Sequence, residues 1–134
     1  MTDITTFVAG LEALEPSGIT MLNDEPTAPP PDNELSVAWV ALPTIIGQPP
    51  TTVINSSVRP IRFRALILVA VAYARQDEQK ERFGALVAAA QDLQAALDGA
   101  DIGFRLSYEI AIDRTVKIGG DSFFGLAAIV TGER

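Results

Sequence analysis

The stretch from residue 60 to residue 74 constrains the fold more than any other part of this chain. Isoleucine, phenylalanine, valine and tyrosine share one face of it, while the other face begins with Arg62 and Arg64 and continues with leucine and alanine. A strand that is polar at its start and apolar on both faces later is typical of the centre of a sheet, under a helix. We therefore expect the remaining elements to assemble around this strand.

Several other segments have the pattern of strands. Apolar side chains alternate along residues 35–42, and residues 104–113 alternate strictly between apolar and polar or charged side chains. Residues 124–130 alternate again after a Gly-Gly-Asp turn at 119–121, which predicts a closing hairpin. Residues 19–22 are long enough for one more short strand.

Two segments, residues 4–14 and 76–97, have apolar side chains at helical spacing. Pro16 and Gly18 end the first helix, and Gly99 suits the end of the second. The order is helix, strands, helix, two strands. It predicts an α+β fold, with a twisted, mainly antiparallel sheet of four to five strands and two helices packed on one face.

The chain of 134 residues has the size of a single domain, residues 1–134. Two loops are longer than the usual connection of about 4 to 6 residues. One is acidic and proline-rich and covers residues 23–34, and the other covers residues 44–59. The segments that flank the first loop are too small to hold separate cores, so it is not a domain linker. We expect both loops to be interaction arms.

The formal net charge is -7, and its distribution is uneven. Residues 1–58 contain seven acids and no base, whereas residues 59–134 contain ten of each. An acidic surface disfavours contacts with nucleic-acid phosphates. The charge either keeps the domain soluble or forms a dedicated acidic surface. The sequence shows no signal peptide and no apolar run of membrane length, so we expect a soluble, reducing location.

The composition argues against catalysis. The chain has no cysteine and no histidine, and it contains no nucleotide-binding or nucleophile motif. Glu109 and Asp113 share a strand face but lie about 13 Å apart, too far for an acid–base pair. The acids of residues 23–34 match no calcium loop. We expect no enzymatic activity, no cofactor and no metal, and we predict Trp39 to be a core residue rather than a binding aromatic.

Several stretches follow one another in a recognisable order. A first helix runs into Gly18-Ile19-Thr20-Met21-Leu22-Asn23-Asp24-Glu25-Pro26, and the acidic loop leads to a strand that ends in Leu42-Pro43. The long strand at 62–69 then precedes an alanine- and leucine-rich helix and a closing hairpin. This layout resembles that of the tail terminator and neck (tail completion) proteins of tailed bacteriophages, over nearly the whole chain.

The resemblance implies a homohexameric ring that caps the tail tube and joins it to the head-proximal connector. DNA would pass through the lumen without specific binding, and the protein would belong to the virion and, during assembly, to the host cytoplasm. No membrane is involved. The expected contacts with other copies, the tube protein or the connector protein involve Asp24, Glu25, Asp32, Glu34, Thr51, Thr52, Asn55, Arg62, Arg64, Arg105, Glu109, Asp113 and Arg114.

Three functions remain open at this point. The first is a tail terminator or another neck component that joins head and tail. The second is a stand-alone, non-catalytic module that binds a protein or a small ligand. The third is an enzyme that uses carboxylates and arginines alone.

Overall fold

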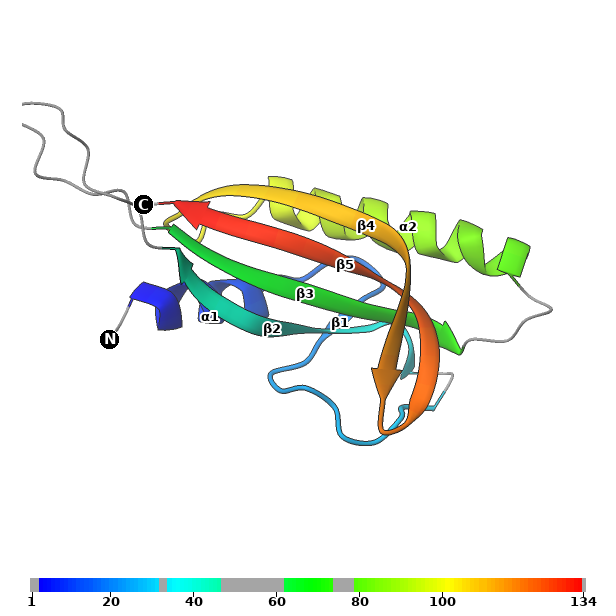
Figure 1. Cartoon of the computed structure of the whole chain (residues 1–134). Helices are drawn as coiled ribbons and strands as arrows, with labels where there is room; N and C mark the ends of the chain where they lie inside the picture. Colours follow the sequence, from blue (N-terminus) through cyan, green and yellow to red (C-terminus); the bar gives the residue numbers. More distant parts are fainter. Residues whose placement is uncertain (1–2, 32–33, 47–61, 74–78, 134) are drawn as a thin grey trace, which may run out of the picture.

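A computed structural model describes residues 3–31, 34–46, 62–73 and 79–133 (Figure 1). The elements, in chain order, are α1 (Asp3–Glu12), β1 (Thr20–Met21), β2 (Val37–Ile46), β3 (Arg62–Tyr73), α2 (Gln79–Asp98), β4 (Arg105–Ile118) and β5 (Asp121–Glu133). The predicted arm at 44–59 lies mostly outside the described residues, apart from its first three residues, which are part of β2. No helix in the described parts is long and apolar enough to cross a membrane.

The strands form one sheet in the order β1-β2-β3-β5-β4, so β3 lies at its centre, as its sequence predicts. β1 runs parallel to β2, and the other neighbouring pairs are antiparallel. The predicted closing hairpin is confirmed, because β4 and β5 pair from Ile118↔Asp121 along most of their length. Its two connecting residues, Gly119 and Gly120, have φ angles of 58° and 93°, which a two-residue turn of this kind requires.

The predicted sheet, mainly antiparallel with four to five strands, is wrong as stated. The sheet is mixed and holds more strand than predicted, although the α+β class stands. β2 continues past Pro43 and β4 continues past Ile112, each through a register shift into a further paired segment. A bulge interrupts the alternation of side chains, and it also accommodates a proline that cannot donate to the ladder. A search for alternating apolar residues therefore does not detect the parts of β2 and β4 that follow the bulges.

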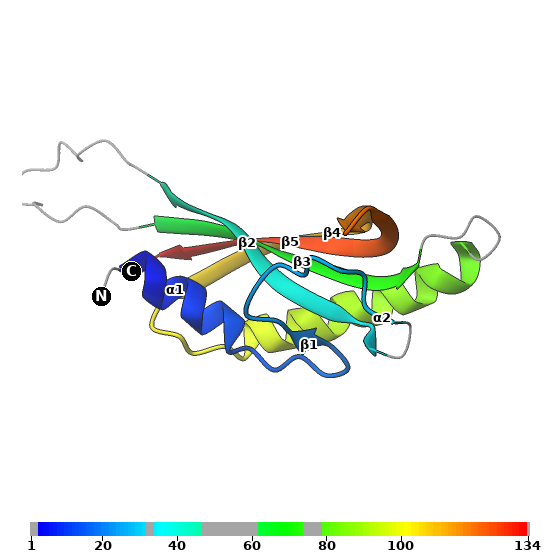
Figure 2. The same ribbon diagram turned by 90° about the horizontal axis from the view of Figure 1, so that it is seen from below.

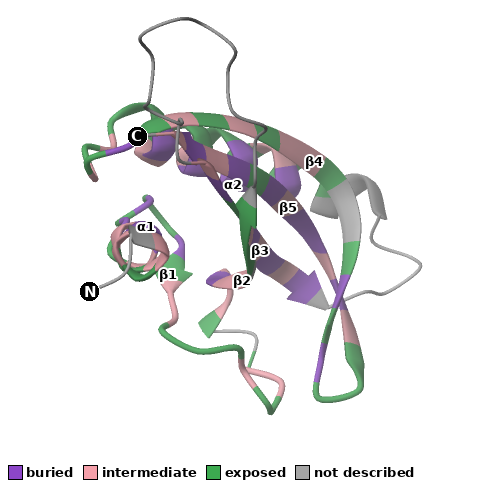
Figure 3. Ribbon diagram, turned by 60° about the vertical axis from the view of Figure 1, so that its left-hand side comes forward, coloured by how far each residue is buried: buried purple, intermediate pink, exposed green. Residues whose placement is uncertain are grey.

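Both helices lie on the same face of the sheet, as the edge-on view shows (Figure 2). The main core fills the space between them and the sheet, with Phe7 and Leu11 from α1 and Leu93 from α2 fully buried. Phe7 packs against the rings of Phe63 and Phe104 at centroid distances of 5.9 and 5.4 Å. Buried residues are concentrated on β3, β5 and α2 (Figure 3).

A second, smaller core lies on the other face, under the curled end of the β4–β5 hairpin (Figure 2). It brings together Val37, Trp39, Ala70, Val116, Ile118 and Phe123. The curl follows the register shift in β4 between Ala111 and Arg114, since a bulge bends a strand and increases its twist. Trp39 is 1% exposed, so its prediction as a core residue is confirmed.

Candidate interaction face

The face of the sheet that carries no helix is here called the open face; Figure 1 looks directly onto it. Paired residues in a sheet point to the same side, so the register fixes which side chains lie on it. One row across the strands contains Trp39, Leu68, Ala127 and Ala111. The next row contains Ala41, Leu66, Ile129 and Glu109. A band of apolar side chains therefore crosses the open face.

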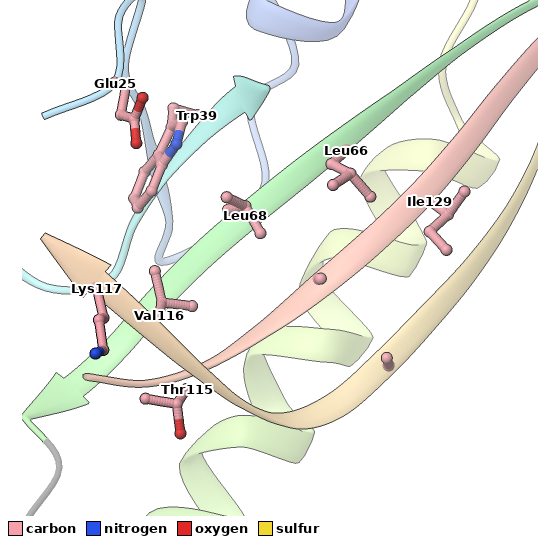
Figure 4. Close-up of a pocket in the computed structure, with 10 residues that line it drawn as sticks. Glu25, Trp39, Leu66, Leu68, Thr115, Val116, Lys117 and Ile129 are labelled. Carbon is pink, nitrogen blue, oxygen red and sulfur yellow. The ribbon is translucent and has the colours of Figure 1, made fainter. Parts of the chain in front are cut away.

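A hollow of about 410 Å³ lies over this band (Figure 4). Its lining residues are Glu25, Trp39, Leu66, Leu68, Ala111, Thr115, Val116, Lys117, Ala127 and Ile129. The paired alanines, Ala111 and Ala127, leave room between the larger side chains. The curled hairpin supplies one wall through Val116. Hollows of this size are typical of sites for a small molecule or for one or two side chains of a partner.

The lining corrects an expectation about the central strand. The sequence predicted that β3 would be buried on both faces beyond its arginines, yet Leu66 and Leu68 are half-buried. Their neighbour Ile129 is 37% exposed. The reason is that both helices lie on the opposite face and the hairpin curls over one end of the open face only. Contiguous exposed apolar side chains rimmed by polar ones are typical of interaction sites.

Trp39 adds an unsatisfied polar group to the hollow. Its indole Nε1 is buried and has no hydrogen-bond acceptor among the described residues. Figure 4 shows this nitrogen on the edge of the ring towards Leu68, which lines the same hollow. A buried donor without an acceptor costs about 1–3 kcal/mol, and such groups are rare in native proteins. The arrangement therefore favours a partner that brings an acceptor.

Basic side chains gather on the open face beyond the apolar band. Arg62 donates from Nε to Oε2 of Glu133 at 3.1 Å, and Arg105 is the cross-strand partner of Glu133 on its other side. Arg64 is exposed and lies opposite Thr131. The side chains of the Arg62–Glu133 pair are 40% and 36% exposed, so the pair contributes little to stability, about 0–1 kcal/mol. The side chains of Arg64 and Arg105 are exposed on this face.

The structure brings some of the predicted interface residues together and separates others. Four of them share the open face, namely Arg62, Arg64, Arg105 and Glu109. Three are exposed on the segment that precedes β2, namely Asp24, Glu25 and Glu34. Asp113 and Arg114 fall at the register shift of β4, where the backbone alone is described. Asp32, Thr51, Thr52 and Asn55 lie outside the described residues.

Sequence reasoning missed the hollow and its apolar lining. One available signal was the pair of small residues Ala111 and Ala127, which occupy positions in β4 and β5 that alternate with larger apolar side chains such as Ile110 and Leu126. Their adjacency depends on the register of β4 against β5, which the sequence does not state. The other signal was that Leu66 and Leu68 follow Arg64 on the same face of β3. An arginine on that face indicates contact with water, whereas the sequence pattern predicts a helix that covers the leucines.

The described titratable groups do not form a recognisable reaction centre. No three carboxylates, histidines or cysteines of the described chain are grouped so as to hold a metal ion. Tyr108 donates a hydrogen bond of 2.5 Å to Asp98 Oδ1, and this bond raises the pKa of the tyrosine. The pair links β4 to the end of α2 on the helical side of the sheet, away from the hollow.

Comparison with known proteins gives no family for this chain. No family model matches it, and no curated protein matches its sequence. The open face, with its apolar hollow, its unsatisfied indole donor and its arginines, is the feature on which a function can be based.

Proposed function

We propose that this protein is a non-catalytic assembly subunit that uses the open face of its sheet to bind other protein chains. The observation that carries the proposal is the hollow on the open face, lined by half-buried leucines and by Trp39, whose buried indole N–H has no acceptor among the described residues. Contiguous apolar surface of this kind on a soluble protein often marks a binding site. The centre of a protein–protein interface is likewise apolar and excluded from water, and it is enriched in arginine and aromatic side chains.

Within this class we propose a ring-forming subunit at the head-proximal end of a phage tail, the tail terminator that joins the tube to the connector. The support is the layout of the elements and the acidic first part of the chain. The edge of the sheet also supports it, since β4 is a long strand with one unpaired edge in the described structure. An exposed strand edge can pair with another chain, and identical subunits form rings through heterologous contacts whose rotation closes.

A second candidate is a stand-alone module that binds a short peptide or small ligand in the hollow, which the volume of about 410 Å³ favours. The two proposals differ in what the purified chain does by itself. A module stays monomeric and binds its ligand one to one, whereas a ring subunit associates with its own copies as its concentration rises.

The test is the oligomeric state of the full chain, measured by sedimentation velocity from micromolar to near-millimolar concentration and by negative-stain imaging. We expect a discrete closed oligomer, six copies for the tail terminator. The variants Leu68→Asp and Ile129→Asp place a charge in the hollow at half-exposed or exposed positions and should dissociate it while circular dichroism stays unchanged. A chain that is monomeric throughout, and whose variants behave identically, would refute the ring.

A further inference from the structure

We infer that the open face of one copy binds the acidic, proline-rich segment of a second copy, here defined as residues 22–31. Prolines of that segment enter the hollow beside Trp39, and Asp24 and Glu25 meet Arg64 and Arg105. The inference rests on the proposed function, because it names the contact through which the ring forms. It commits to a second copy rather than to a different protein.

Charge is the first support. The chain carries its entire net charge of -7 on residues 1–58, which contain no base, and Asp24 and Glu25 are exposed on the segment. The open face carries Arg64 and Arg105, both exposed, next to the apolar hollow. The same molecule therefore displays an acidic segment and, on another surface, two exposed arginines that share the open face with Glu109 and Glu133. Such complementarity steers association and fixes which surfaces meet.

Hydrogen-bonding chemistry is the second support. Trp39 needs an acceptor, and prolines bring apolar rings and backbone carbonyls without an N–H that would itself need a partner. Aromatic-lined grooves also bind proline-rich segments because these are already extended, so little conformational entropy is lost on binding. Pro26 is half-exposed and Pro31 is exposed, whereas the half-exposed Pro29 presents only the part of its ring that does not lie against Gly119. Nε1 is covered in the single copy, so the bond also requires a rotamer change within the hollow.

Spacing is the third support. Leu68 at the hollow and Arg64 are four residues apart on β3, about 13 Å at strand rise. Glu25 and Pro29 are also four residues apart, and an extended segment spans about 12 Å over that length. A proline over Leu68 can therefore be accompanied by a carboxylate at Arg64 when the segment, which bends at residues 23–24 and 27–28 in the single copy, is extended.

Apart from Leu22, which packs against the second core, and Glu25, which lines the hollow, the segment lies outside the hollow of its own chain. Gly119, in the hairpin turn, lies against the carbonyl of Thr27 and the ring of Pro29, and of this segment Glu25 alone lines the hollow. Figure 1 shows the segment passing below the sheet beside that turn. Because the donor segment and the receiving face are different parts of the molecule, the contact is heterologous, and its repetition gives a ring when the rotation between copies closes on itself.

The experiment is a charge swap in the full chain. One variant, Arg64→Glu/Arg105→Glu, reverses the face, and the other, Asp24→Lys/Glu25→Lys, reverses the segment. All four positions are exposed, so folding should be retained, and circular dichroism with urea unfolding checks it. The matched controls keep the charges: Arg64→Lys/Arg105→Lys and Asp24→Glu/Glu25→Asp. Sedimentation velocity measures the association of each chain and of the two reversed variants mixed in equal amounts.

We expect each reversed variant alone to associate at least about tenfold more weakly than the natural chain, because like charges then face each other. The controls should associate normally. The mixture should regain the oligomer, with the two variants alternating, because both kinds of junction are then oppositely charged.

Two results would overturn the inference in different ways. If the natural chain forms a ring and the reversed variants form it equally well, or their mixture stays dissociated, the ring stands and this contact is wrong. If the natural chain itself stays monomeric, the contact and the proposed function both fail.

Discussion

Replacing Trp39 by phenylalanine tests whether its indole nitrogen really lacks a partner. Trp39 is 1% exposed, so the substitution removes buried apolar surface. Aromatic side chains bury roughly 150–250 Å², so tryptophan to phenylalanine removes at most about 100 Å². At about 25 cal/mol per Å² this costs up to about 2.5 kcal/mol. Removing a buried, unsatisfied N–H returns about 1–3 kcal/mol.

The two effects nearly cancel, so Trp39→Phe should change the free energy of unfolding by less than about 1.5 kcal/mol. Trp39→Ala, which removes the whole ring, should cost about 3–5 kcal/mol and serves as the control. Urea unfolding is followed by far-ultraviolet circular dichroism, because Trp39 is the one tryptophan of the chain and fluorescence is lost with it. A loss above about 3 kcal/mol in Trp39→Phe would mean that the N–H has an acceptor and that the reasoning about the hollow is wrong.

Further predictions concern the sheet, α2 and the Tyr108–Asp98 pair. Gly125→Ala should destabilise the protein by about 2–4 kcal/mol in urea unfolding, because the added Cβ would lie 2.1 Å from the carbonyl oxygen of Val69. Gly84→Ala is the contrasting case: a Cβ there meets nothing within 4 Å, so alanine in this exposed helix position should stabilise the protein, by about 0.5–1 kcal/mol. The bond to Asp98 raises the pKa of Tyr108, so its stabilisation is present below the ordinary tyrosine pKa and is lost as the pH rises through the folded value. Urea midpoints of Tyr108→Phe should therefore fall less between neutral and strongly alkaline pH than those of the natural chain; equal falls would contradict the role of the pair.

Much of the fold follows from local pattern. The alternation along β3 indicates a strand that needs neighbours on both sides, and the structure places it between β2 and β5. The Gly119-Gly120 pair indicates a tight turn because glycine adopts positive φ without steric cost, and the turn lies there. Trp39 lies on a face with other apolar residues and is buried. In each case the cause acts within a few residues along the chain.

The bulges in β2 and β4 are the features of the sheet that side-chain alternation could not predict. A register shift places two residues of one strand opposite fewer residues of its neighbour, so alternation reverses without any change in composition. A search for period two therefore ends the strand at that point. The β4–β5 hairpin continues, curls over Val37 and Trp39, and forms the second core.

By itself, the sequence determined the α+β class, the central strand, the closing hairpin and the concentration of negative charge in residues 1–58. These depend on side-chain periodicity and on counts of residues, which are properties of the chain. The tertiary structure alone decided that Leu66 and Leu68 lie on the face without helices and stay half-buried there, and that Arg64 and Arg105 lie on the same face. Those relations join residues far apart in the chain, and they depend on strand register and helix placement, which packing of the whole core determines.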